Sequence, residues 1–146
     1  MVEYVKHGEI LLAIIVSPDQ AEPGIQFLTP DDFSQQLACM RHPVGKLVEP
    51  HVHNPAPRAV HYTQEVLFIR RGKVRVDFYD GARTYLSSRV LQSGHVILLA
   101  AGGHGFLMLE ETEMIEVKQG PYIGEKDKTR FQGIAAEQVR IRGEHD

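Results

Sequence analysis

The chain has 146 residues, of which 42% are hydrophobic, and this combination allows one domain with a single core. Its 16 basic and 19 acidic residues are interleaved and give a net charge of -3, so the basic surface needed for binding nucleic acid or an anionic membrane is lacking. The only cysteine, Cys39, excludes an internal disulfide framework, and we expect a reducing, cytoplasmic environment.

The first predicted element is the apolar run ILLAIIV at residues 10–16. It is far shorter than the roughly 20 residues that cross a bilayer, and no basic leader precedes it, so we interpret it as a buried strand. A turn-rich connection follows. We then expect one short helical turn capped by Thr29 or Asp31, and a second strand near Leu37 to Arg41.

The pattern becomes clearer in the middle of the chain, where EVLFIRRGKVRVDFYDGARTYLSS contains three β-rich runs. They are separated at Arg71-Gly72 and at Asp80-Gly81, and both breaks predict hairpins. Within KVRVDFY, apolar and polar residues alternate, which is typical of a strand with one face in a core. The inward residues would be Val74, Val76 and Phe78.

Further strands are predicted in HVILLA, FLMLE and EMIEVKQG, which are separated by glycines or by Glu111-Thr112. At least eight strands result, and no helical segment is long enough for a βαβ crossover. The sequence therefore predicts an all-β fold, an antiparallel jelly-roll β-barrel with short peripheral helical or irregular segments. Residues 120–146 are more charged, and we expect an ordered peripheral cap or a short helix near Ala135 to Arg140, with frayed last residues.

Potential metal ligands are concentrated in EPHVHNPAPRAVHYTQE, residues 49–65. If the segment around His51 and His53 is extended, both imidazoles project from the same side. Glu65 would share a face with apolar residues of the next strand, and a buried carboxylate is costly unless it is paired or binds a cation. His104, flanked by glycines, is a fourth candidate. Two histidines and a carboxylate form an open set suited to iron, zinc or manganese.

These residues resemble the motifs of the cupin superfamily. Gly45, His51-Val52-His53, Glu65 and Gly72 resemble the first motif, and residues 94–104 resemble the second, in which a glycine-bracketed histidine supplies the last ligand. The resemblance covers about residues 45–118. It implies one divalent ion (zinc, iron, manganese or nickel) held in a barrel by His51, His53, Glu65 and His104.

The sequence departs from the family pattern at two points. Eleven residues separate His53 from Glu65, where a typical cupin has three or four, and an alternative alignment places His61 at the second histidine and Ala59 at the first. We prefer the first alignment because Gly45 keeps its distance to His51. In AAGGH, which ends at His104, the first position is not the proline that is usual in the second motif. One residue fewer than usual also precedes the histidine.

Each candidate also has an ordinary structural interpretation. Glu65 would instead be a surface residue paired with Arg58, Arg70 or Arg71, and His104 a turn residue. His61 is a candidate acid or base, a donor to a ligand, or a plain loop residue. The isolated histidines are interpreted as loop or core residues: His7, His42, His95 and His145.

The resemblance implies a small-molecule substrate, and we favour isomerase or lyase chemistry on a polar, carbohydrate-type compound. The alternatives are a non-catalytic protein that binds a sugar or other effector, an iron(II)-dependent dioxygenase, and a jelly roll without metal. Small cupins often form homodimers, so we also expect a dimer, with ILLAIIV as a strand that two copies exchange.

Overall fold

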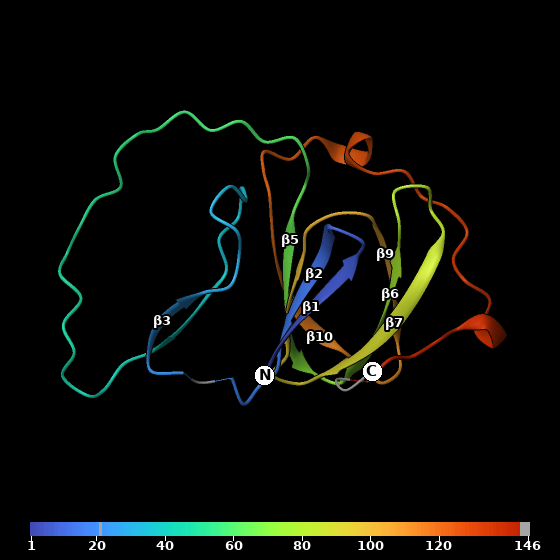
Figure 1. Cartoon of the computed structure of the whole chain (residues 1–146), viewed down its shortest axis with the longest axis horizontal. Helices are drawn as coiled ribbons and strands as arrows, with labels where there is room; N and C mark the ends of the chain where they lie inside the picture. The colour runs from blue at the N-terminus through green and yellow to red at the C-terminus, as the bar shows by residue number, and fades with distance from the viewer. Residues whose placement is uncertain (21, 144–146) are drawn as a thin grey trace.

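The computed structural model of the chain describes residues 1–20 and 22–143, and the described part is built from β-strands (Figure 1). The all-β prediction is therefore confirmed. Ten strands are present among the described residues: β1 (Val2–His7), β2 (Ile10–Val16), β3 (Gly24–Phe27), β4 (Ala38–Arg41), β5 (Glu65–Arg71), β6 (Lys73–Tyr79), β7 (Tyr85–Gln92), β8 (Val96–Leu99), β9 (Gly103–Met108) and β10 (Glu113–Lys118).

The strands form three antiparallel sheets. A five-stranded sheet has the order β1-β2-β8-β5-β10, a three-stranded sheet has the order β7-β6-β9, and β3 and β4 form a separate hairpin. The predicted strand at residues 10–16 is confirmed as β2. Within the described chain none of the sheets closes on itself, so the barrel stays a prediction.

The two larger sheets pack face to face around one core. Val74, Val76 and Phe78 are at most 1% exposed and meet side chains from the five-stranded sheet in a single cluster. The inward direction predicted for these three side chains is confirmed. The opposite face of the strand is also covered near its end, where Asp77 and Tyr79 are 6% and 4% exposed. Leu67 and Ile69 of β5 are buried in the same cluster, which places the inner face of β5 opposite β6.

One of the two predicted hairpins is wrong. The chain forms the β6–β7 hairpin after Asp80-Gly81, as expected, but β5 and β6 lie in different sheets. Gly72 turns the chain between the sheets with a φ of +85°, and a Cβ there would lie 2.1 Å from the carbonyl oxygen of Glu111. Glycine is therefore required for a crossing between sheets, not for a tight hairpin.

The chain between β3 and β4 covers the outer face of the five-stranded sheet. Leu28, Phe33 and Leu37 pack there with a second cluster of apolar side chains. The predicted strand is confirmed as β4, but the expected helical turn before it is absent, and residues 29–37 contain a turn at 31–32 and bends. Thr29 is used differently from a helix cap, since its Oγ1 donates to Gln36 Oε1 and accepts from the Leu37 N–H.

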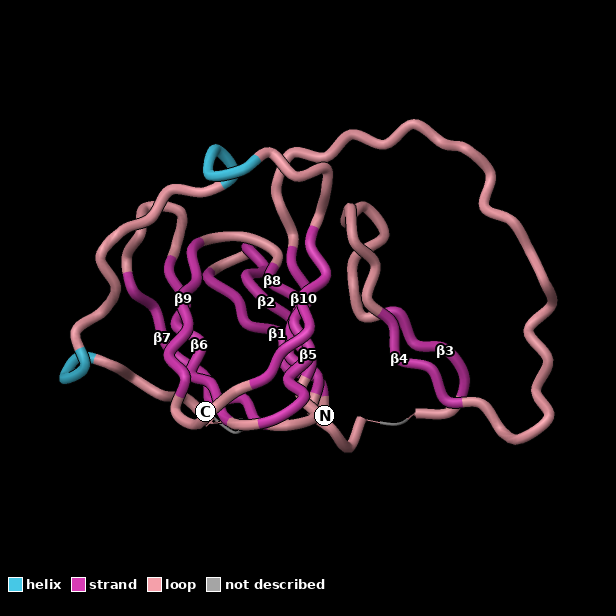
Figure 2. The backbone as a smooth tube through the Cα atoms, turned by 180° about the vertical axis from the view of Figure 1, so that it is seen from behind, coloured by secondary structure: helices cyan, strands magenta, loops and turns pink. Residues whose placement is uncertain are grey.

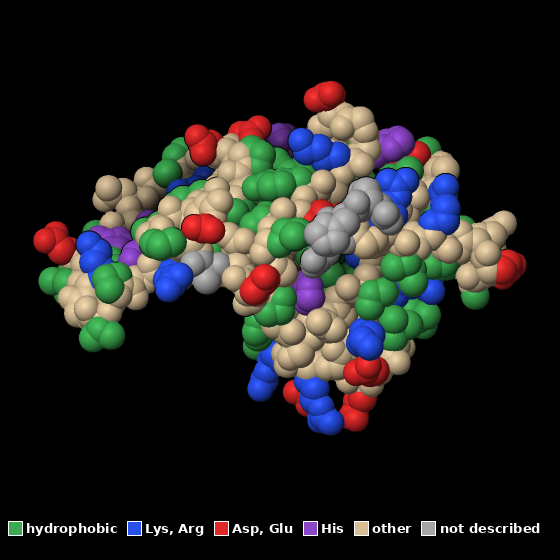
Figure 3. All heavy atoms as spheres, turned by 60° about the horizontal axis from the view of Figure 1, so that its bottom comes forward, with side chains coloured by type: hydrophobic (Ala, Val, Ile, Leu, Met, Phe, Trp, Pro, Cys, Tyr) green, Lys and Arg blue, Asp and Glu red, His purple; other side chains and the backbone are tan. Residues whose placement is uncertain are grey.

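A long segment without helix or strand connects β4 to β5. We call residues 42–62 the arm. Figures 1 and 2 show it as a wide arc that leaves the sheets together with the β3–β4 hairpin and returns at β5. In the space-filling view this part stands out from the body and carries apolar side chains on its surface (Figure 3).

The C-terminal segment runs along the three-stranded sheet. It includes the 3-10 helices η1 (Gly124–Asp127) and η2 (Ala136–Gln138), and the second confirms the short helix predicted near residues 135–140. Ser88 of β7 exchanges backbone hydrogen bonds with Arg140 and Arg142. The described residues contain no helix that is both long and apolar enough to cross a membrane.

Candidate functional site

Two of the predicted site residues meet between the sheets. Glu65 begins β5 and shares its face with Leu67 and Ile69, as the alternation predicts, and its side chain is 14% exposed. His104 lies on β9 in register with Phe78 and therefore faces inward too. Its Nε2 is 3.3 Å from Glu65 Oε2. The two sheets thus bring together a carboxylate and an imidazole that are distant in sequence.

Lys118 is a charged residue of this site that was not predicted from the sequence. It pairs with Glu65 in the β5–β10 register, and its Nζ lies 3.8 Å from Glu65 Oε1 and 3.2 Å from Glu116 Oε1. The only sequence signal was the alternation of EMIEVK, which places Lys118 on the same face as Met114 and Glu116. The surface arginines considered as partners of Glu65 do not contact it; Lys118 and His104 do.

The pair borders a pocket at the end of the sandwich. Its lining includes aromatic side chains from three parts of the chain, Tyr79, Phe106 and Phe131, beside Glu65, His104 and Lys118. The rings of Tyr79 and Phe131 meet edge to face with their centroids 5.0 Å apart. The C-terminal segment forms one wall of this pocket, which therefore offers both apolar surface and hydrogen-bonding groups to a small molecule.

The Glu65 carboxyl has a lowered pKa. The hydrogen bond from His104 is the main cause, and the charges of His104, Lys118 and Lys128 act in the same direction, whereas burial opposes them. The carboxylate is consequently ionised at neutral pH, where it accepts hydrogen bonds and protons.

This shift predicts a loss of stability in acid. The folded-state pKa of Glu65 lies below the ordinary value of 4.5, so its contacts stabilise the fold above about pH 4.5, and the contribution is lost as pH falls through the folded-state value. We expect Glu65→Gln to flatten this part of the stability profile, measured by urea unfolding between pH 3 and 7 (roughly the range over which carboxyls titrate). An unchanged slope in the variant would contradict the assignment.

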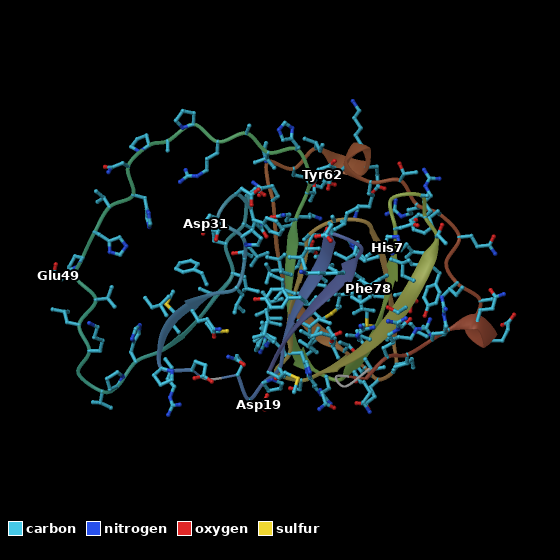
Figure 4. The ribbon with its side chains drawn as sticks, in the orientation of Figure 1. His7, Asp19, Asp31, Glu49, Tyr62 and Phe78 are labelled. Atoms are coloured by element: carbon cyan, nitrogen blue, oxygen red, sulfur yellow. The ribbon has the colours of Figure 1, made fainter. Side chains whose placement is uncertain are left out.

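The structure does not bring His51 and His53 to Glu65 and His104. Both lie on the arm with exposed side chains, where their rings meet at 5.3 Å and His51 Nδ1 is 3.0 Å from the carbonyl oxygen of Glu49. Figure 4 labels Glu49 at the outer limit of the arm, well away from Phe78 in the core. The predicted alternation holds only inside a paired strand, and the arm pairs with no strand in the described chain.

His61 also lies outside the Glu65–His104 contact. It is exposed near the end of the arm and lines a neighbouring pocket with Arg58, Tyr62 and Asp127. The two pockets share Tyr62, Thr63 and Asp127, and the Thr63 hydroxyl donates to the Asp127 carboxylate. Among the isolated histidines, His95 is buried, His7 and His42 are exposed, and His145 lies outside the described residues.

The predicted four-ligand metal set is therefore not assembled in one chain. Among the described residues no three His, Cys, Asp or Glu side chains converge in a way that would hold a metal ion. Glu65 and His104 supply two donors, and a divalent transition metal ordinarily takes three or more from the protein. The residues gathered in one chain do not fit such an ion.

Comparisons with known proteins add no assignment to this geometry: no family model, curated protein or solved structure matches the chain.

Proposed function

We propose that the protein binds a small polar molecule with hydroxyl and carbonyl groups, as in a carbohydrate, in the pocket beside Glu65 and His104, and exchanges protons with it. The contact of 3.3 Å between the carboxylate and the imidazole carries the proposal. A base and a proton donor within reach of the same ligand are the requirement of general acid–base catalysis.

The reaction that suits this pair is the shift of a proton beside a carbonyl group. The Glu65 carboxylate accepts a proton from the carbon next to the carbonyl, and the electron pair of that C–H bond forms a carbon–carbon double bond. The carbonyl oxygen takes a proton from the His104 N–H, which gives an enol. In a 2-hydroxy carbonyl compound the former carbonyl carbon takes the proton back from Glu65, while the neighbouring hydroxyl gives its proton to His104 and becomes the new carbonyl, which completes an isomerisation. In a 3-hydroxy carbonyl compound the enol returns its O–H proton to His104, and the hydroxyl on the third carbon leaves as water with the proton held by Glu65, which is a lyase reaction.

The lining of the pocket supports a carbohydrate-type ligand. Phe106 and Phe131 offer ring surface to the apolar faces of a sugar, the buried Tyr79 ring packs against Phe131, and Lys118 offers a cation to a hydroxyl or carboxylate group. A protein that only binds such a compound needs the same surface but no proton transfer, so the two functions differ in what happens to the ligand's C–H bonds.

We infer that the sandwich is an incomplete jelly roll of the cupin kind. The connections β5–β6, β7–β8, β8–β9 and β9–β10 each cross from one large sheet to the other, as in jelly rolls. The sheets end at β9 and β10, and a strand added to each would continue the barrel.

A divalent metal joins the proposal only if further ligands reach Glu65 and His104. His51 and His53 of an arm are the candidates for these further ligands. The alternative function, an iron(II)-dependent dioxygenase, also requires that they reach Glu65 and His104. No step above uses a metal.

The test is hydrogen exchange into the ligand. In D2O, we expect the protein to exchange deuterium for the hydrogen on the carbon beside the carbonyl of simple aldoses, ketoses or sugar acids. The loss of that hydrogen's signal is measured by proton NMR. Because general acid–base groups contribute about 10²–10⁴-fold, Glu65→Gln and His104→Gln should each lower the rate by about 100-fold or more. The metal content of the same preparations, measured by elemental analysis, shows whether the rate follows a bound ion.

Glu113→Gln is the matched control. It lies on β10, where its carboxylate is 53% exposed and 3.9 Å from Arg71, away from the pocket. Its exchange rate should equal that of the unchanged protein. Binding of the compounds by calorimetry without any exchange would support the binding-only function, and absence of both would end the proposal.

A further inference from the structure

The sandwich is open along one side. In the three-stranded sheet, the outer edge of β7 is covered by the C-terminal segment through Ser88, whereas within the described chain nothing pairs with the outer edge of β9. The five-stranded sheet likewise ends at β10. Residues 109–112 join β9 to β10, so the free edges of these two strands are neighbours, whereas β1 ends the five-stranded sheet on its other side. Unpaired edges present rows of N–H and C=O groups to which another strand can pair.

Apolar side chains are left uncovered at this opening. Phe106 and Met108 stand in register with Val76 and Val74, so they share the inner face, yet they are 37% and 44% exposed. Val76 and Val74 themselves are fully buried. The inward side chains of β9 are thus exposed, whereas those of the neighbouring β6 are buried. A further strand beside β9 would bury them.

The arm is a segment of the right kind to occupy this edge. It is extended and carries exposed apolar side chains, including Val44, Leu47, Val48 and Val52. At roughly 3.3 Å per residue, residues 42–62 reach about 70 Å, several times the length of β9. The arm therefore has enough chain both to leave the body and to lie along a strand.

The hairpin that precedes the arm indicates a second copy as the acceptor. Ile25, Phe27 and Met40 of β3 and β4 are 54%, 61% and 63% exposed, and the two strands of the hairpin lie apart from the larger sheets (Figures 1 and 2). If the arm folded back onto its own β9, this apolar hairpin would stay uncovered. Exchange about a two-fold axis covers both arms and both hairpins at once, as a self-complementary interface does.

We propose that the arm of each copy pairs with the free edge of β9 in a second copy, giving a dimer with exchanged arms. The exchanged segment is not ILLAIIV, because β2 is already paired on both sides, with β1 and β8. The exchange does not depend on the chemistry proposed for Glu65 and His104. It carries His51 and His53 toward the strand that bears His104, so two chains would contribute to one site.

Cross-linking between two single-cysteine variants tests the exchange. In a Cys39→Ala background, Val52→Cys marks the arm and Leu107→Cys, an exposed position on β9, marks the edge. The two proteins are mixed unfolded, refolded together and treated with a short bismaleimide. We expect a covalent dimer on a denaturing gel. In the control, Ala82→Cys in the exposed β6–β7 turn replaces Leu107→Cys, and the yield of covalent dimer should be severalfold lower.

The doubly substituted chain, with both Val52→Cys and Leu107→Cys, distinguishes the alternatives. Exchange predicts covalent dimers from it and a dimer mass by light scattering of the unmodified protein. Cross-linking only within one chain, at monomer mass, would show that the arm folds back and would overturn the proposal. A monomer with no cross-link above the Ala82→Cys control would overturn it equally. None of these results depends on ligand binding or hydrogen exchange.

Discussion

Replacing Phe78 with alanine is expected to lower the free energy of unfolding by about 3–5 kcal/mol, as for other large buried aromatic residues. Phe78 is 1% exposed and is the largest of the fully buried side chains. It belongs to the cluster that both large sheets share. Its removal therefore leaves a cavity between the sheets that neither sheet can close alone. Since the chain lacks tryptophan, urea unfolding followed by circular dichroism is the suitable measurement.

Tyr122→Ala is the control for this change. Tyr122 is also aromatic but is 86% exposed on the C-terminal segment, and surface substitutions of this kind usually shift stability by no more than about 0.5 kcal/mol. If both variants lose the same small amount, the two sheets do not share the core described for them. A large loss confined to Phe78→Ala locates the stability of the protein between the sheets.

Local alternation in the sequence was sufficient to predict the buried strands. Val74, Val76 and Phe78 were assigned inward from period two alone, and ILLAIIV from its continuous apolar character, because both patterns report burial directly. The strand β1 was missed because VEYVKH mixes charged and apolar residues, and Val5 is its one buried residue. Its place beside β2 is decided by pairing, which a local pattern does not record.

The wrong hairpin prediction has the same cause, because turn signals do not show which strands pair. Arg71-Gly72 and Asp80-Gly81 look alike as turn signals, yet the first leads into the opposite sheet and the second into a neighbouring strand. At the first break the carbonyl oxygen of Glu111 occupies the space where a side chain at residue 72 would lie. Such a contact comes from the other end of the fold and leaves no mark near Gly72.

The candidate site was only partly predictable, because its contacts also depend on which strands are paired. The inward direction of Glu65 followed from its apolar neighbours in β5, and His104 was recognised as a candidate ligand from its glycine-rich surroundings. Their contact and that of Lys118 depend on which strands are neighbours. For His51 and His53, alternation predicts a common side but not where the segment lies, and in one copy the arm lies away from the sheets.

Removing the Arg89 side chain is the other change expected to cost about 3–5 kcal/mol, the usual loss when one partner of a buried ion pair is deleted. Arg89 is in register with Val76 and Glu3 with Ile15, so both face inward, from different sheets. Arg89 Nε donates to Glu3 Oε1 at 2.7 Å, and the two side chains are only 10% and 22% exposed. In Arg89→Ala, the Glu3 carboxylate would lose its cation between the sheets. Urea unfolding at neutral pH measures the loss.

Two further variants separate this explanation from a general sensitivity to lost arginines. Arg71→Ala removes an arginine that is 67% exposed and 3.9 Å from Glu113, so a change of no more than about 0.5 kcal/mol is expected. The double change Glu3→Leu with Arg89→Met should recover most of the stability lost in Arg89→Ala, because no uncompensated charge remains between the sheets. If the double variant is as unstable as Arg89→Ala, the loss comes from the packing and hydrogen bonds of Arg89 with Ser87 and Ser88, not from an unpaired carboxylate.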